Sequence, residues 1–397
     1  MYKILCRTYQ TVMKVGNYFL PYHTPKCIQG PSCVNKVASY VKKENISNVL
    51  IVIGKHISKS GLADNMINEL EKENIMYTIF NNIDQNPTSD NVEEGYNIFK
   101  ENQCQGIIVF GGGGPMDCAK AIAAKVAQPN KSISQLQGIL KVHKKVPPLF
   151  AVPTTSGTGS ETTIAAVITD SKTRHKASIN DTALIPEYAF LDPLLTMGLP
   201  PNITAITGMD ALCHAVEAYT NSRYCTKLEN ELAKKAVKLI YDNLYIAYVD
   251  GNNIKARQNM QKASFFAGRA FTRGCVGYVH AIGHTLGGLY DVPHGLAMAV
   301  ILPHVLRQYD YHIYDKLADL ADVCGISGVN NQDKAIKFIE WIETVNKKMG
   351  LQSSMNMIQD KDIPQIIDWA IKEANPLYPV PVIWNKDDFE KLIDLLR

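Results

Sequence analysis

Three of the ten histidines of the chain, His280, His284 and His294, lie within residues 280–294, HAIGHTLGGLYDVPH. Asp210 and His214, in GMDALCHAVEAY, are four residues apart, so on a helix both side chains leave the same face. His280 and His284 repeat that spacing. A carboxylate with several imidazoles suits Zn²⁺ or Fe²⁺, whereas Mg²⁺ prefers oxygen ligands. We therefore predict a divalent metal site whose anionic ligand is Asp210.

Two glycine- and hydroxyl-rich segments follow apolar runs. Residues 111–114 are GGGG after GIIVF, and glycines at a strand-to-helix turn let backbone N–H groups approach an anion. A flexible tight turn is the alternative interpretation. In PTTSGTGSETT, residues 153–163, the hydroxyls of Thr154 and Thr155 could bind phosphate or ribose oxygens. Thr158 and Glu161 also fit a capping box at a helix start.

The elements that must position these residues differ between the two halves of the chain. In the first half, strand-like runs at 49–53, 77–80, 106–110 and 149–152 alternate with helical patterns at 61–75, 90–102 and 115–127. This order predicts a parallel sheet with helices on both faces, a Rossmann-like α/β domain over residues 1–198.

The second half shows successive helical patterns, for example at 229–249 and 333–350. We therefore predict an all-helical domain over residues 199–397, with a hinge near the prolines of LDPLLTMGLPPNI. Such an arrangement would make the cleft between the domains the natural site.

Composition excludes several classes of protein. The 397 residues are 46% hydrophobic and 20% charged, with a net charge of +3 and no basic tail, so we expect no nucleic-acid partner. No apolar run reaches the roughly 18 residues that span a bilayer, and the N-terminal segment lacks a secretory-signal pattern. Nine irregularly spaced cysteines are typical of reduced thiols. These features predict a cytoplasmic protein.

Several long segments in the same order are similar to those of the iron-containing (group III) alcohol dehydrogenases. They are GGGGPMDCAK, PTTSGTGSETT, TGMDALCHAVEAY, GYVHAIGHTLGGLYDVPHGLAMAVILP and NPLYPVPVIW, and the resemblance runs from about residue 25 to the end. It implies a dehydroquinate synthase-like fold, an α/β dinucleotide-binding domain followed by a helical metal-binding domain. It also implies a homodimer or larger homo-oligomer.

Carried over position by position, the resemblance makes Asp210, His214, His280 and His294 the metal ligands and favours Fe²⁺ over Zn²⁺. His284 matches a histidine near the metal but outside its ligand set. We predict that it relays the alcohol proton, and the alternative is that it only hydrogen-bonds a neighbour of the metal. The cofactor-binding positions are Asn86, Gly112, Gly113, Gly114, Asp117, Thr154, Thr155, Thr163, Val167 and Lys176.

One departure from the family concerns the cofactor. Many members have an aspartate just after the strand that corresponds to 49–53, where it hydrogen-bonds the adenosine ribose; here Gly54 occupies that position. A carboxylate would repel a ribose 2′-phosphate, and glycine removes the repulsion. With Lys55, His56 and Lys59 close by, this predicts that NADP(H) is favoured over NAD(H).

The predicted reaction is hydride transfer between NAD(P)(H) and a small primary alcohol or aldehyde. Ala165, Phe271 and Cys275 are expected to line the substrate pocket because they lie beside the cofactor and metal segments. The alternatives on the same fold are a polyol (glycerol or 1,3-propanediol) dehydrogenase, a hydroxyacid–oxoacid transhydrogenase and a dehydroquinate synthase-like lyase. A non-catalytic protein of this fold would have lost a metal ligand or the glycine turn, and neither is lost.

Overall fold

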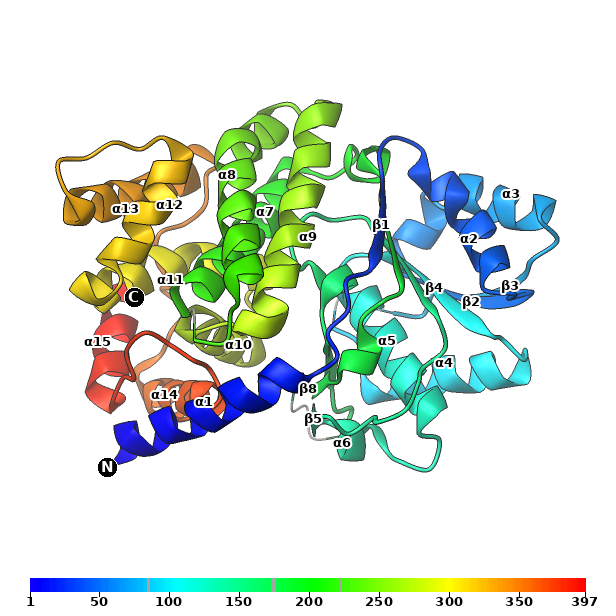
Figure 1. Cartoon of the computed structure of the whole chain (residues 1–397), viewed down its shortest axis with the longest axis horizontal. Coiled ribbons are helices and arrows are strands. Elements are labelled where there is room, and N and C mark those ends of the chain that lie inside the picture. Colours follow the sequence, from blue (N-terminus) through cyan, green and yellow to red (C-terminus); the bar gives the residue numbers. More distant parts are fainter. Residues whose placement is uncertain (84–85, 173–175, 222) are drawn as a thin grey trace. The chain divides into compact units, whose positions relative to one another are not determined.

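The computed structural model describes residues 1–83, 86–172, 176–221 and 223–397 (Figure 1). The chain packs as two units, one of residues 21–198 and one of residues 199–397 together with Met1–Leu20. The structure thus places residues 1–20 with the helical unit, whereas the sequence assigned them to the first domain. The physical reason is a set of hydrogen bonds from the first helix, α1 (Tyr2–Phe19), to the C-terminal region.

The unit of residues 21–198 contains a six-stranded, all-parallel sheet with the strand order β1-β9-β6-β4-β2-β3. Its strands are β1 (Lys26–Gln29), β2 (Asn48–Ile53), β3 (Met76–Phe80), β4 (Gly106–Gly111), β6 (Leu149–Pro153) and β9 (Tyr188–Leu191). A smaller sheet has the order β5-β8-β7, with β5 (Gly138–Ile139), β7 (Ala165–Thr169) and β8 (Lys176–Asn180).

Helices cover both faces of the large sheet because its central strands are apolar on both sides. Alternate residues of β2 point to opposite faces: Leu50 and Val52 pack with one hydrophobic cluster, Ile51 and Ile53 with the other. The first cluster includes α4 (Ser89–Glu101) and α5 (Gly113–Ala127), and the second includes α2 (Val37–Lys43) and α3 (Asp64–Lys72). A short helix, α6 (Ile133–Leu136), lies before β5. The predicted parallel sheet with helices on both faces is confirmed.

The strand order has a switch point between β2 and β4. From β2 the chain adds β3 on one side, and from β4 it continues to β6 and β9 on the other. In open parallel sheets, ligands bind at the carboxyl ends of the strands on either side of such a point. Here Gly54 follows β2 and Gly112 follows β4.

The other unit is all-helical, as predicted. Its helices, besides α1, are α7 (Pro201–Asn221), α8 (Lys227–Val249), α9 (Ile254–Gly274), α10 (Tyr278–Tyr290), α11 (His294–Tyr309), α12 (Tyr314–Cys324), α13 (Asn331–Lys348), α14 (Ile363–Ala374) and α15 (Lys386–Leu396). Helices α7, α8 and α9 pack on one another, α11 packs on α7, and α10 packs on α11 and α14 (Figure 1). Among the described residues, no helix is both long and apolar enough to cross a bilayer.

Candidate functional site

The predicted metal ligands come from three helices of the helical unit. Asp210 and His214 lie one turn apart on α7, His280 lies in the first turn of α10, and His294 is the first residue of α11. A ligand atom from each of the four falls within 4.8 Å of the others. The structure therefore brings together residues that are up to 84 positions apart in the sequence, from Asp210 to His294.

The separations between these atoms suit a shared cation better than direct hydrogen bonds. Oδ1 of Asp210 is 3.8 Å from Nδ1 of His214, 3.8 Å from Nε2 of His280 and 3.3 Å from Nε2 of His294. Ligands bound tetrahedrally at about 2.1 Å are roughly 3.4 Å from one another, whereas 3.8 Å is too long for a hydrogen bond.

The buried ligand atoms lack other partners. Among the described residues, no hydrogen bond satisfies Oδ1 of Asp210, Nδ1 of His214 or Nε2 of His280, although all three atoms are shielded from solvent. Unsatisfied buried polar atoms are costly, so three of them gathered in one cluster indicate that these atoms bind a cation. A borderline divalent ion such as Fe²⁺ or Zn²⁺ fits this donor set of one carboxylate and three imidazoles.

Glu217, which sequence reasoning missed, fixes the orientation of His280. Its Oε2 is 2.6 Å from Nδ1 of His280, and its Oε1 accepts from the Val279 N–H at 2.8 Å. The carboxylate holds the imidazole proton on Nδ1 and leaves Nε2 free for a metal. The signal was present in the sequence, since Glu217 is three residues beyond His214 and seven beyond Asp210 on the same helix face.

Burial controls the protonation of the cluster. It lowers the pKa of His214 to about 3 and that of His280 well below the usual range, so both imidazoles are neutral near pH 7. Burial alone would raise the pKa of Asp210, but the neighbouring His214, His294 and His280 outweigh it and hold that pKa low. One anionic carboxylate and neutral imidazoles form the protonation state that binds a metal without releasing protons.

His284 lies beside the cluster but outside the set of four convergent ligands. Its ring is 5.2 Å from that of His294, centroid to centroid, and its Nδ1 is 2.7 Å from Oε1 of Glu373 on α14. Tyr378 donates to the same carboxylate oxygen at 3.0 Å. The side chains of His284 and Glu373 are 29% and 30% exposed, so the pair connects the edge of the cluster to solvent.

Two of the expected pocket residues belong to the same unit as the cluster, Phe271 on α9 and Cys275 directly after it. The Phe271 ring stacks on His214 with centroids 4.1 Å apart. Cys275 follows the helix with φ 59°, and burial raises its thiol pKa to about 12, which keeps the thiol protonated and apolar. The third, Ala165, lies in the other unit, at the start of β7. That the three line one pocket stays a prediction.

The glycine turn lies at the switch point of the large sheet. Gly112 is the N-cap of α5 without a side-chain cap, and Gly113 and Gly114 form its first turn. A Cβ on Gly112 would meet Oγ1 of Thr155 at 3.2 Å, and one on Gly113 would meet a Thr158 methyl at 2.8 Å. The approach of two chain segments therefore requires glycine here, and the helix start favours an anion.

The predicted capping box at Thr158 and Glu161 is wrong. The segment forms only a short 3-10 turn, Ser160–Thr162, whose N-cap is Gly159. The Thr158 hydroxyl accepts from the Ser160 N–H at 3.3 Å instead. Gly159 adopts φ +58°, and this left-handed residue diverts the chain before a regular helix can start. Upstream, Oγ1 of Thr154 is buried and has no partner among the described residues.

Lys120, also missed, organises several predicted cofactor residues. Its fully buried Nζ lies within hydrogen-bond distance of four oxygens: Ser160 Oγ at 3.2 Å, Thr163 O and Oγ1 at 2.7 and 2.8 Å, and Ala165 O at 3.1 Å. Burial lowers its pKa to about 8. Burial likewise raises the pKa of Asp117 to about 6 and that of Glu161 to about 7.

Other predicted cofactor residues of this unit form two further groups of contacts. The Val167 N–H and the Ser160 hydroxyl both donate to Asp117. Nζ of Lys176 donates to Oδ1 of Asn86 at 3.0 Å, which joins two exposed positions 90 residues apart. Gly54 is half-buried, and a Cβ there would meet only Pro115 Cγ, at an ordinary 3.4 Å.

Comparisons with known proteins match both units of the chain to the same protein family. Residues 24–193 match the family model "Iron-containing alcohol dehydrogenase", and residues 204–395 match "Fe-containing alcohol dehydrogenase family, C-terminal". The chain is 38% identical to a 1,3-propanediol dehydrogenase of Klebsiella pneumoniae over 87% of its own length and 90% of that protein. It is 37% identical to an NAD-dependent methanol dehydrogenase of Bacillus methanolicus, over 73% and 74% of the two chains. The crystal structure of a 1,3-propanediol oxidoreductase superposes with a TM-score of 0.91 at 35% identity, over 96% of this chain and 100% of that one.

Proposed function

The chain belongs to the iron-containing alcohol dehydrogenase family, and from this premise we propose that it interconverts small primary alcohols and aldehydes by hydride exchange with a nicotinamide cofactor. The observation that carries the proposal is the set of buried, unpartnered ligand atoms of Asp210, His214 and His280 that converge with His294. A purely structural histidine cluster would satisfy its nitrogens internally.

Asp210, His214, His280 and His294 hold the metal, which is Fe²⁺ by family membership; Zn²⁺ suits the same donors. A bound divalent ion would polarise the substrate oxygen and lower the pKa of an alcohol. Glu217 acts as a positioning residue, because it keeps His280 in the tautomer that can bind.

His284 moves the substrate proton. It lies at the edge of the ligand cluster, and its other contact is the partly exposed Glu373, so a proton taken up by the imidazole has a path toward water. The ordered Nδ1 contact leaves Nε2 for the substrate side.

The nicotinamide cofactor binds along the carboxyl ends of β2, β4 and β6. Gly112, Gly113 and Gly114 approach its phosphates, with the hydroxyls of Thr154 and Thr155 close by. Asn86 and Lys176 are joined by a hydrogen bond on the surface. Asp117, Thr163 and Val167 are held by the hydrogen bonds around Lys120.

NADP(H) is accepted, and is favoured over NAD(H), because Gly54 puts no carboxylate where a ribose 2′-phosphate would lie. Lys55, His56 and Lys59 are exposed within the next five residues and add positive charge. The methanol dehydrogenase relative is described as NAD-dependent, so a direct comparison of the two cofactors is required.

The substrate is an uncharged alcohol of modest size. Phe271, stacked on His214, presents apolar surface beside the ligands. Cys275, whose buried thiol stays protonated, follows the same helix and adds a further apolar side chain. A second candidate is 1,3-propanediol, because both the Klebsiella relative and the superposed crystal structure carry that substrate in their names.

The test is anaerobic turnover by metal-free protein reloaded with Fe²⁺ or Zn²⁺. Butyraldehyde reduction is compared with NADPH and NADH, and 1,3-propanediol oxidation with butanol oxidation. Metal-dependent activity that is faster with NADPH supports the full proposal, and activity with NADH alone removes the cofactor preference. No turnover of any of these substrates, with metal shown to be bound, contradicts the proposed function.

A further inference from the structure

Helix α1 presents an apolar face to solvent. Leu5, Val12, Val15 and Phe19 are 65%, 66%, 58% and 77% exposed, and Met1 is fully exposed. Together with Thr8 they form what we call the α1 stripe: Met1, Leu5, Thr8, Val12, Val15 and Phe19. Single exposed apolar residues are ordinary, but a contiguous row along one helix indicates an interaction surface.

The opposite face of α1 is anchored, so the stripe is held in place. Arg7 donates to the carbonyls of Val380 and Pro381 at 2.9 and 2.8 Å, and Gln10 donates to the carbonyl of Tyr378 at 2.8 Å. Cys6, Gln10 and Asn17 are buried. An amphipathic helix normally buries its apolar side, whereas α1 docks through polar side chains and leaves much of its apolar surface outside.

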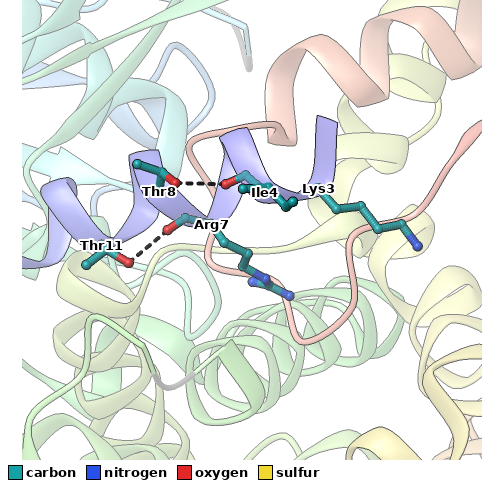
Figure 2. Close-up of a pocket in the computed structure, with 5 residues that line it drawn as sticks. All are labelled: Lys3, Ile4, Arg7, Thr8 and Thr11. Carbon is teal, nitrogen blue, oxygen red and sulfur yellow. Dashed lines mark hydrogen bonds between the residues drawn. The ribbon is translucent and has the colours of Figure 1, made fainter. Parts of the chain in front are cut away.

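The spacing within the stripe is that of a helix-pairing seam. Successive members are separated by 4, 3, 4, 3 and 4 residues, the a/d repeat of a coiled coil. Thr8 fits this seam because its hydroxyl donates to the Ile4 carbonyl at 3.0 Å, which needs no outside partner (Figure 2). A surface hollow lined by Lys3, Ile4, Arg7, Thr8 and Thr11 runs from Thr8 of the stripe toward the basic side of the helix (Figure 2).

From these observations we infer that α1 pairs with α1 of a second copy of the chain. The 4-3-4-3-4 spacing reads the same in both directions, so two antiparallel helices related by a two-fold axis place Met1 opposite Phe19, Leu5 opposite Val15 and Thr8 opposite Val12. Every stripe residue then has a stripe residue as its partner.

The distribution of charge permits this self-pairing. The positions that flank the seam are uncharged: Tyr2, Ile4, Tyr9, Thr11, Gly16 and Tyr18. The basic residues Lys3, Arg7 and Lys14 lie outside both the seam and its flanks, so pairing two copies brings no like charges together. A membrane-surface helix would instead turn its basic face to lipid headgroups, and here Arg7 on that face is bound to protein carbonyls.

The available area is sufficient for a specific contact. Seven side chains of α1 are at least 58% exposed: Met1, Ile4, Leu5, Val12, Val15, Tyr18 and Phe19. At roughly 100 Å² each, their burial removes roughly 700 Å² per copy from water. Each partner in a standard specific interface buries about 800 Å².

Mass measurement of the full-length protein by sedimentation tests the inference. The double substitution L5E/V12E puts unpaired carboxylates into the seam, and we expect it to halve the mass of the largest wild-type species. The matched control K3E/K14E adds the same two side chains to the same helix outside the seam, and it should leave the mass unchanged. Unchanged circular dichroism and turnover would show that both variants are folded.

Cross-linking tests the register directly. T8C/V12C should form a disulfide-linked dimer under mild oxidation, because these positions face each other across the two-fold axis, whereas K3C/K14C should not. A monomeric wild type, an L5E/V12E variant of wild-type mass, or the absence of T8C/V12C cross-links would each overturn the inference. Stripe-dependent sedimentation of a monomer with phosphatidylserine vesicles would assign the surface to lipid instead.

Discussion

Replacing Glu217 by glutamine tests how the metal ligands are held. The carboxylate accepts from Nδ1 of His280 and from the Val279 N–H, and the Gly277 N–H also donates to it. A glutamine of the same shape has one carbonyl oxygen and an NH₂ group. Its NH₂ group therefore faces at least one of these N–H groups and cannot accept a hydrogen bond from it. The imidazole that must present Nε2 to the metal is then held less firmly.

The expected loss follows from the geometry. Replacing the partner of a metal-bound histidine lowers metal affinity by about 10- to 100-fold, or about 1.4 to 2.7 kcal/mol. The upper end of this range applies, because the 2.6 Å contact joins side chains that are only 2% and 5% exposed, where water cannot substitute for the lost acceptor.

Competition with a chromogenic chelator for Zn²⁺ or, without oxygen, for Fe²⁺ measures the affinity. E373Q is the matched control, because Glu373 makes the same contact, at 2.7 Å, to His284, which is not among the four convergent ligands. E217Q should bind metal at least 10-fold more weakly than E373Q does. Equal affinities in the two variants would refute this role for Glu217.

Four further predictions address other parts of the chain. G54D should lower the NADPH-to-NADH ratio of kcat/KM by about 10-fold or more through charge repulsion, whereas G54N should not; equal ratios would exclude the role of Gly54. H284A should slow alcohol oxidation roughly 100-fold with metal still bound, and full activity would remove the proton relay. G295A should reduce metal content and stability, because its Cβ would lie 2.3 Å from a backbone oxygen of α7. G288A is the control, since a Cβ there meets nothing within 4 Å, and equal losses in the two variants would contradict the prediction. Glu161, whose pKa burial raises from 4.5 to about 7, keeps its proton in the folded state over that range, so unfolding free energy should fall by on the order of 3 kcal/mol between these pH values; a denaturation series showing the same fall in E161Q would contradict this.

The sequence predicted the large sheet where the strands are long and apolar. The runs at 49–53 and 106–110 are central strands buried on both faces, and their continuous apolar residues are typical of such strands. Strand β1 was missed because its four residues, Lys26–Gln29, contain a single buried position. The small sheet was missed as well. Its strand β7 alternates between buried and half-buried residues directly after the hydroxyl-rich segment, and β8 has a single buried residue, Ile179.

The site was predictable to the extent that its spacing is local. Asp210 and His214 are one helical turn apart, and Glu217 continues the same face and could have been included. Glu373 gave no local signal, since it reaches His284 from 89 residues away through the packing of α14 on α10. The placement of α1 depends likewise on hydrogen bonds to backbone carbonyls of residues 376–381. The sequence of α1 itself does not indicate that it binds this distant segment.

The most direct test of the central claim is an anaerobic titration of metal-free protein with Fe²⁺, in which bound metal and aldehyde reduction are measured on the same samples. D210N is the comparison, because it removes the single anionic ligand while keeping its shape. We predict that activity rises with bound metal and saturates at one ion per wild-type chain, and that D210N neither retains the ion nor gains activity. Full activity of the metal-free protein, or metal-stimulated activity in D210N equal to that of the wild type, would contradict the account.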